Sequence, residues 1–217
     1  DASAAFLIGQ AFIAYLGAKR IVVGRDMRTS APEISAAFIE GALKQGADVV
    51  DCGMIGTDML YYAVARGDFD GGAEITASHN PKEYIGLKLV RRHAIPLSSD
   101  AGIGDIRDMI IHGQIPTGGS ASGSCSQANI LKPYLNHVRS FVDLTLIKPF
   151  RLVLDAGSGI AGMVAPPLLE DLPCDTTKLC FEVDGSFPHH EANPLIEENR
   201  RDIVDRVVAD SADAGIA

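Results

Sequence analysis

Apolar residues recur with helical spacing at the start of the chain and then gather into a short run. Ile8, Phe12 and Leu16 fall on one face of a helix, so the first segment is expected to be an amphipathic helix. Residues 20–24 are mostly β-branched and apolar, which is typical of a short buried strand. The chain is therefore expected to open with a helix followed by a strand of a sheet.

The same change between helical and strand patterns continues along the first half of the chain. Ser30 and Glu33 have the spacing of a capping box, with Pro32 between them, so we expect a helix there that ends at Gly46. By the same criteria we expect a strand at 47–51, a helix at 57–66 and a strand ending before residue 78. Strands that alternate with helices of this length are typical of βαβ units with a mostly parallel sheet.

Further elements are expected on both sides of a polar interruption. Residues 113–126 are rich in glycine and serine and are predicted to form an exposed loop without chemistry. The further elements expected are a strand at 84–90, helices at 100–111, 129–142, 160–172 and 196–208, and strands at 151–155 and 212–217. Residues 148–150 mark the expected boundary, so we expect one domain over 1–148 and a second over 149–217.

Composition narrows the function classes. The chain has 217 residues, of which 47% are hydrophobic, enough to bury a sizeable core. A formal net charge of −9 argues against nucleic acid as a partner, and no apolar run approaches the ~20 residues that span a bilayer. The four cysteines form no Cys-x-x-Cys pair, so neither a zinc site nor a disulfide framework is indicated, and a cytoplasmic location is expected.

The strongest candidate for chemistry lies where the strand before residue 78 ends. Ser78 stands next to His79, and Asn80-Pro81 is a turn signal. The alternating strand that follows could return the ammonium of Lys88 towards the serine, and a hydroxyl, an imidazole and a cation together favour phosphate handling. The alternative is a turn without chemistry, since serine and asparagine stabilise turns through local hydrogen bonds.

Residues 76–81, Thr-Ala-Ser-His-Asn-Pro, resemble the phosphoserine loop of the α-D-phosphohexomutases, and the nearest match is the bacterial phosphomannomutase/phosphoglucomutase type. Segments 23–30, 86–90, 154–162 and 184–194 are similar to other family motifs and come in the family's order. The resemblance implies an α/β protein with two similar three-layer α/β/α domains and mixed, mostly parallel sheets, the second domain being incomplete. It covers nearly the whole chain, and we expect the family's metal loop to follow residue 217.

The resemblance also implies an activity. Ser78 would carry a phosphoryl group and act in an intramolecular phosphotransferase that interconverts hexose 6-phosphate and hexose 1-phosphate, with mannose ahead of glucose as the sugar. Mg²⁺ would be bound through the Ser78 phosphate, with its carboxylate ligands outside this chain, and hexose 1,6-bisphosphate would be the activator. The expected partners are phosphorylated hexoses and the missing C-terminal domains, with no membrane partner.

Individual roles follow from the same motifs. Lys88 and His79 are the candidates for moving the proton of a sugar hydroxyl, and Arg25 and Asn80 for binding phosphate. The alternatives are a solvated strand lysine, turn residues at 79 and 80, and a surface ion pair of Arg25. Arg28 is expected to be structural. His189 and His190 are expected to be loop residues rather than a metal pair.

Two further readings remain open. The chain could be a folded but catalytically inert fragment of a mutase, because the metal loop and the sugar-binding domains are not in it. A serine hydrolase built on Ser78 and His79 is disfavoured, because Gly-x-Ser-x-Gly is absent and adjacent triad members rarely point at one another.

Overall fold

The computed structural model describes residues 1–118 and 122–217, and these form two compact units. The first unit comprises Asp1–Asp26, Ser30–Thr76 and Ile85–Ile130, and the second comprises Met27–Thr29, Ala77–Tyr84 and Leu131–Ala217. The segments Met27–Thr29 and Ala77–Tyr84 thus group with the second unit although they join elements of the first. The domain boundary expected at residues 148 and 149 remains a prediction.

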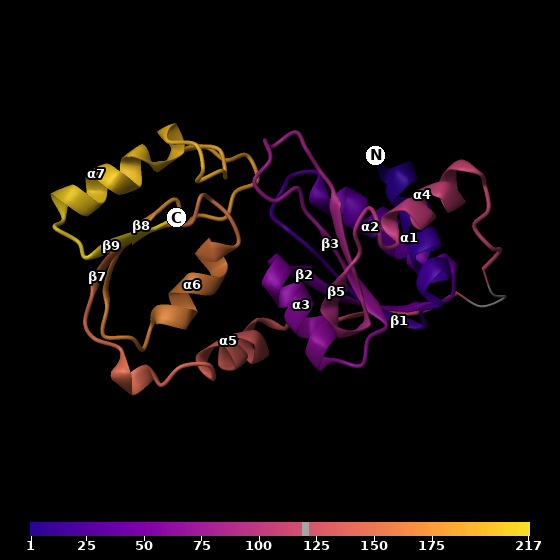
Figure 1. Cartoon of the computed structure of the whole chain (residues 1–217), viewed down its shortest axis with the longest axis horizontal. Helices are drawn as coiled ribbons and strands as arrows, with labels where there is room; N and C mark the ends of the chain where they lie inside the picture. The colour runs from indigo at the N-terminus through magenta and orange to yellow at the C-terminus, as the bar shows by residue number, and fades with distance from the viewer. Residues whose placement is uncertain (119–121) are drawn as a thin grey trace. The chain divides into compact units, whose positions relative to one another are not determined.

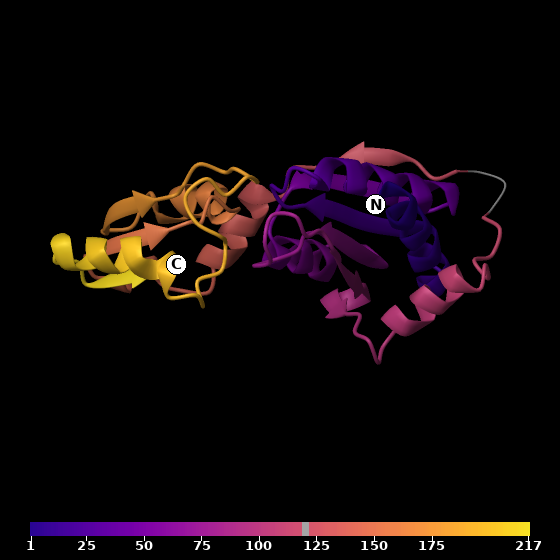
Figure 2. The ribbon, with the colours of Figure 1, turned by 90° about the horizontal axis from the view of Figure 1, so that it is seen from above.

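The first unit is built on a six-stranded sheet of order β5-β4-β3-β1-β2-β6. Its strands are β1 (Arg20–Arg25), β2 (Asp48–Met54), β3 (Gly71–Ile75), β4 (Leu87–Arg91), β5 (Ile95–Pro96) and β6 (Cys125–Gln127). The pairs β1/β2, β1/β3 and β2/β6 are parallel, whereas β4 runs antiparallel to both β3 and β5. Figure 2 shows β6 as the outermost strand on its side of this sheet.

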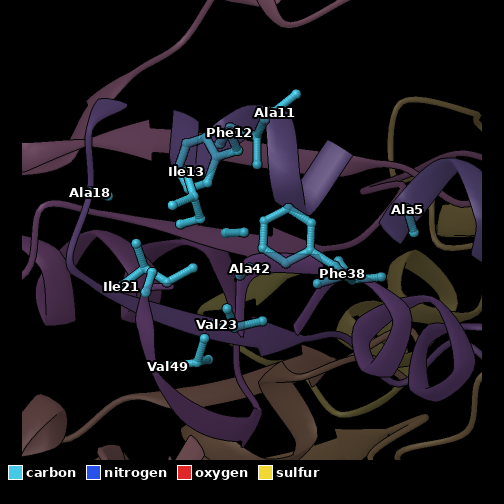
Figure 3. Packing of buried hydrophobic residues seen from close by; sticks show 14 of the residues in the cluster. Ala5, Ala11, Phe12, Ile13, Ala18, Ile21, Val23, Phe38, Ala42 and Val49 are labelled. Carbon is cyan, nitrogen blue, oxygen red and sulfur yellow. The ribbon is translucent and has the colours of Figure 1, made fainter. Parts of the chain in front are cut away.

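Helices cover both faces of this sheet (Figure 1). They are α1 (Ala2–Leu16), α2 (Ala31–Lys44), α3 (Thr57–Arg66) and α4 (Ile103–Ile111), with a short 3-10 helix η1 (Arg92–Ala94). The residues Phe12 of α1 and Phe38 of α2 pack with ring centroids 6.0 Å apart above Ile21 and Val23 of β1 (Figure 3). Burial of these side chains is the main driving force for this layer.

The close approach of α1 and α2 depends on glycine. A Cβ on Gly9 would lie 2.2 Å from the carbonyl oxygen of Phe38, and a Cβ on Gly41 would lie 2.0 Å from that of Phe6. No side chain fits at either position without moving backbone. The first core is therefore formed by two helices in backbone contact lying on the sheet.

The second unit has a three-stranded parallel sheet of order β8-β7-β9. Its elements are α5 (Leu131–Arg139), η2 (Leu144–Leu146), β7 (Arg151–Asp155), α6 (Ala161–Leu169), β8 (Asp175–Leu179), η3 (Glu198–Arg200), α7 (Arg201–Ala209) and β9 (Ala214–Ile216). Figure 1 draws α6 and α7 on opposite sides of this sheet, so the expected three-layer α/β/α arrangement is confirmed in both units.

Most of the predicted elements are present, with two corrections. Ser30 precedes α2, but its side chain makes no capping hydrogen bond, so the capping box is wrong in its chemistry although the helix begins there. Within the loop predicted at 113–126, residues 119–121 lie outside the described residues, and Cys125 and Ser126 belong to strand β6. In the part of the chain that the structure describes, no helix is long and apolar enough for a membrane span.

Candidate functional site

Ser78 lies in a tight turn that follows β3. The strand ends at Ile75, and Ser78 adopts a left-handed backbone conformation with φ of 55°. The turn is closed by the backbone N–H of Asn80, which donates to the Ala77 carbonyl oxygen at 3.1 Å, and by the Asn80 Nδ2, which donates to the same oxygen at 2.8 Å. Ser78, His79 and Asn80 are all exposed. A non-glycine residue in this conformation is strained by about 1–2 kcal/mol, so the surroundings must hold it in place.

Arg28 stabilises the turn through hydrogen bonds to its backbone. Its guanidinium is 1% exposed and donates to the carbonyl oxygens of Ser78 at 2.8 Å, Asn80 at 2.7 Å, Pro81 at 2.7 Å and Tyr84 at 3.1 Å. The same group lies over the ring of Phe187, 5.3 Å from its centroid. The expectation that Arg28 is structural is confirmed: it binds backbone along the whole serine loop.

Lys88 takes part in a different set of contacts, in the first unit. It lies on β4 directly opposite Glu74 of β3, because the two strands pair antiparallel in that register. The Lys88 Nζ donates to Thr57 Oγ1 at 2.8 Å, and Thr57 Oγ1 donates to Glu74 Oε2 at 2.6 Å. Lys88 is therefore held through a hydroxyl by a carboxylate on the neighbouring strand.

The sequence analysis missed two residues of this network, Thr57 and Glu74, and Glu74 is the more unusual of the two. It is 2% exposed, and burial raises the pKa of its carboxyl to about 7, although the hydrogen bond from Thr57 and the charge of Lys88 act in the opposite direction. A carboxylate within a fully buried strand requires a polar or charged partner. This requirement could have marked Glu74 in the sequence as a member of a polar network. The register that supplies the partner follows only from the strand pairing.

Arg25 ends β1 and is partly buried. Its Nη1 lies 3.5 Å from the carbonyl oxygen of Asp26, and its side chain helps to line a pocket of about 330 Å³ together with Ser35, Glu40 and Asp51. A guanidinium at a strand end can bind an anion, but the carboxylates of Glu40 and Asp51 oppose an anion inside this pocket. The phosphate-binding roles of Arg25 and Asn80 and the proton-transfer role of His79 stay predictions.

A further polar cluster lies at the end of β7 in the second unit. Asp155 Oδ1 accepts from the Gly157 N–H at 2.8 Å, and Asp155 Oδ2 lies 3.0 Å from His190 Nε2. The Cys180 Sγ lies 3.7 Å from the same Nε2. His190 therefore belongs to a side-chain cluster, which its expected place in a loop did not indicate.

Burial and hydrogen bonding shift two pKa values in this cluster. Burial opposes the charged imidazole, but the Glu191 carbonyl and the Asp155 carboxylate outweigh it and raise the pKa of His190 above its usual value. Burial, with the Asp155 charge adding to it, raises the pKa of the Cys180 thiol to about 11. Asp155, Cys180 and His190 come from three separate segments of the chain, so their spacing in the sequence could not have revealed the cluster.

The expected Mg²⁺ requires several oxygen ligands. Among residues 1–118 and 122–217, the group of three possible metal-binding side chains with ligand atoms within 4.8 Å of one another is Asp155, Cys180 and His190. Nitrogen and sulfur in that group do not suit Mg²⁺, and Ser78 is not part of it. The binding of Mg²⁺ through Ser78 therefore stays a prediction.

Comparisons with known proteins agree with this architecture. The sequence profile of phosphoglucomutase/phosphomannomutase α/β/α domain I matches residues 1–113, and that of domain II matches residues 132–217. A phosphomannomutase of Escherichia coli is 38% identical over 98% of this chain. A phosphomannomutase/phosphoglucomutase of Pseudomonas aeruginosa is 38% identical over 91% of it.

Solved structures show the same similarity in three dimensions. A phosphoglucomutase/phosphomannomutase family protein from Burkholderia thailandensis superposes with a TM-score of 0.88 at 35% identity, covering 99% of this chain and 48% of that one. The chain also spans 48% of the Escherichia coli relative and 41% of the Pseudomonas relative. It therefore corresponds to about half the length of the proteins it matches.

Proposed function

Because the chain belongs to the phosphoglucomutase/phosphomannomutase family, we propose that it supplies the phosphoserine-bearing part of a hexose-phosphate mutase. The observation that carries the proposal is the exposed Ser78 in a left-handed turn whose carbonyl groups are bound by Arg28. Such a turn presents a hydroxyl to a large polar ligand without requiring the backbone to move. The preferred substrate is a mannose phosphate, with glucose phosphate second, and the expected location is the cytoplasm.

The proposed cycle transfers one phosphoryl group from Ser78 to the sugar and another from the sugar to Ser78. Phospho-Ser78 gives its phosphoryl group to a free hydroxyl of a hexose monophosphate: the Ser78 O–P bond breaks and a sugar O–P bond forms. The proton of the sugar hydroxyl passes to the Ser78 oxygen. The resulting hexose 1,6-bisphosphate reorients, and its other phosphoryl group passes to the Ser78 hydroxyl: the second sugar O–P bond breaks and the Ser78 O–P bond forms again. The proton of the Ser78 hydroxyl passes to the released sugar oxygen. Atoms and charge balance, and the cycle consumes no co-reactant, because the free bisphosphate serves only to load Ser78 with its first phosphoryl group.

The residues are proposed to act mostly through charge and position, because phosphoryl transfer leaves little covalent work to the protein. A phosphoserine carries a charge of about −1.5 to −2. Arg25 would offset charge on a phosphate, Asn80 would keep the turn closed, and Lys88 would move the hydroxyl proton, with His79 as the second candidate. Thr57 and Glu74 would orient Lys88, because the hydroxyl accepts from its ammonium and donates to the carboxylate.

Mg²⁺ is proposed to bind through the Ser78 phosphate, where it would neutralise charge on the transferring group. The carboxylate ligands are proposed to come from outside these 217 residues. The roles given to Ser78, Lys88 and Arg25 do not pass through the ion.

The proposal is tested by incubating the chain with glucose 1,6-bisphosphate labelled with ³²P. We expect label on a single serine, identified as Ser78 by mass spectrometry, and no label on Ser78→Ala. Ser99→Ala, which changes another exposed serine, is the matched control and should label like the parent. A folded parent chain without label, or a Ser78→Ala variant that is labelled equally, would refute the role of Ser78.

A second possibility is that the chain is an inert fragment, and the observation that favours it is its coverage of about half of its relatives. We propose that the chain alone can be phosphorylated but does not turn over. A coupled assay from mannose 1-phosphate to mannose 6-phosphate should show activity only when the chain is part of a protein of the relatives' length. Substantial turnover by the 217 residues alone would contradict this.

A further inference from the structure

Asp155, Cys180 and His190 bring a carboxylate oxygen, a thiol sulfur and an imidazole nitrogen within 4.8 Å of one another. Asp155 ends β7 and Cys180 directly follows β8, the neighbouring parallel strand in Figure 1. The side chain of Asp155 is 1% exposed and that of His190 is 16% exposed. Three chemically different metal-binding groups thus meet at one end of the second sheet.

Hydrogen bonds fix how the imidazole is used. His190 Nδ1 lies 3.0 Å from the Glu191 carbonyl oxygen, which can only accept, so Nδ1 must carry a hydrogen. In a neutral ring, Nε2 is then an acceptor, yet it faces the acceptor oxygen Asp155 Oδ2 at 3.0 Å. Two lone pairs at this separation require a cation between them, which is either a proton or a metal ion.

The separations of the three possible ligand atoms are close to those found around a metal ion. Around a tetrahedral Zn²⁺, with bonds of roughly 2.0–2.3 Å, neighbouring ligand atoms lie roughly 3.2–3.8 Å apart. The distance from His190 Nε2 to Cys180 Sγ is 3.7 Å and lies within this range. The distance from the same Nε2 to Asp155 Oδ2 is 3.0 Å, which is shorter than the range and is the length of a hydrogen bond, so an ion would have to displace a proton and move the two atoms slightly apart. Small side-chain rotations would centre one ion among the three atoms. We propose that Asp155, Cys180 and His190 form a binding site for Zn²⁺ or a divalent ion of similar chemistry.

The surroundings of the three residues suit this role. Metal-binding histidines usually donate their other N–H to a carbonyl or carboxylate, as His190 does to Glu191, and ligating carboxylates are themselves hydrogen-bonded, as Asp155 is by Gly157. A pocket of about 180 Å³ lined by Asp155, His190 and Asn193 leaves room for a water as fourth ligand. The donor set of this site differs from the oxygen ligands expected for Mg²⁺, and the proposal does not depend on the proposed mutase activity.

The first experiment titrates the metal-free chain with Co²⁺ under reducing conditions. We expect one ion per chain and a thiolate-to-cobalt absorption band, displaced by Zn²⁺ and unaffected by excess Mg²⁺, which avoids sulfur and nitrogen. Cys180→Ser should remove the band, and His190→Gln should weaken binding by more than about tenfold, since loss even of an outer partner costs 10–100-fold. Cys174→Ser and His189→Gln are the matched controls and should bind like the parent.

A second measurement needs no variant. Zn²⁺ should protect Cys180 from iodoacetamide, read by mass spectrometry of its peptide, whereas the exposed Cys125 should be alkylated at the same rate with and without the metal. Absence of the cobalt band in the parent, unchanged Zn²⁺ affinity in both Cys180→Ser and His190→Gln, or equal alkylation of Cys180 with and without Zn²⁺ would each overturn the proposal.

Discussion

Arg28 and Glu74 are both charged side chains withdrawn from water, yet they are compensated in different ways. Arg28 is 1% exposed and spreads its charge over four carbonyl oxygens of the serine loop. Glu74 is 2% exposed and relies on one hydroxyl, Thr57, and one ammonium, Lys88. The cation is surrounded by fixed dipoles, whereas the anion depends on two side chains.

This difference predicts that pH affects the two regions of the molecule differently. A guanidinium stays charged in proteins, so the contacts of Arg28 persist at any pH at which the chain is folded. The carboxyl of Glu74 has a pKa of about 7 and changes its charge near neutrality. The serine loop should therefore keep its conformation when the pH changes. The polar network of Lys88, Thr57 and Glu74 should change its stability with pH.

The largest effect is expected from Arg28→Met. Four carbonyl oxygens lose their donor, and the loss should cost about 3–5 kcal/mol of local stability, by analogy with breaking buried polar networks. The loop contains Lys82, so tryptic cleavage there should accelerate by about 100-fold or more, since 1.4 kcal/mol is a factor of ten.

Arg91→Met, which removes an exposed arginine from the end of β4, is the matched control and should leave cleavage at Lys82 unchanged. Arg28→Lys keeps the charge but not the forked geometry and should fall between the two. If Arg28→Met were cleaved at the parent's rate, the loop would be held by something else.

The second prediction concerns pH. The pKa of Glu74 rises from 4.5 to about 7 on folding, so between these values the folded state holds a proton that the unfolded state has lost. The stability contribution of this group must then fall as pH rises from 4.5 to 7, and a penalty of about 3 kcal/mol should remain above pH 7.

Hydrogen exchange of the β3 and β4 amides, measured at pH 5 and pH 8, tests this on the network itself. Glu74→Gln should remove the penalty, so the variant gains protection relative to the parent at pH 8 and not at pH 5. Glu33→Gln, an exposed carboxyl on α2, should show no such change. Equal pH dependence in the parent and Glu74→Gln would mean that Glu74 does not titrate in this range.

The third prediction is that Lys88→Met destabilises β3 and β4 in a pH-dependent way, with a smaller effect than that of Glu74 ionisation. Without the ammonium, ionised Glu74 keeps only the Thr57 hydroxyl, so we expect a loss of about 2 kcal/mol at pH 8. At pH 5 the carboxyl is protonated and the loss should shrink to less than about 1 kcal/mol. The measurement is again amide exchange in β3 and β4, and a loss independent of pH would show that packing of the lysine stem matters more than its charge.

Sequence patterns were sufficient where one face of an element is buried. Residues 57–66 were predicted as a helix and form α3 with those bounds, and Ser78 follows a strand end as expected. β8 was missed because Asp-Thr-Thr-Lys-Leu is polar and only partly buried. β6 was missed because its residues are all exposed and it gains its structure from pairing with β2.

The candidate site was accessible only in part from the sequence. Ser78 stands in a motif whose residues are adjacent in the chain, so local reading found it. Thr57 and Glu74 join Lys88 through strand register and a helix start, and no local pattern records such a meeting. The cluster of Asp155, Cys180 and His190 was missed for the same reason.

The smallest effect is expected from Thr57→Val, which removes the hydroxyl that links the two charges and keeps the side-chain shape. The Lys88 ammonium and the Glu74 carboxylate would each lose one hydrogen bond, at a cost of about 1–2 kcal/mol at pH 8. Thr57→Ser retains the hydroxyl and should restore most of that loss, which a role in packing alone would not allow. Because valine leaves both charges in place, the pH dependence attributed to Glu74 should persist and shift to higher pH, since Thr57 lowers the pKa of that carboxyl. A shift to lower pH would show that the hydroxyl does not stabilise the ionised carboxylate.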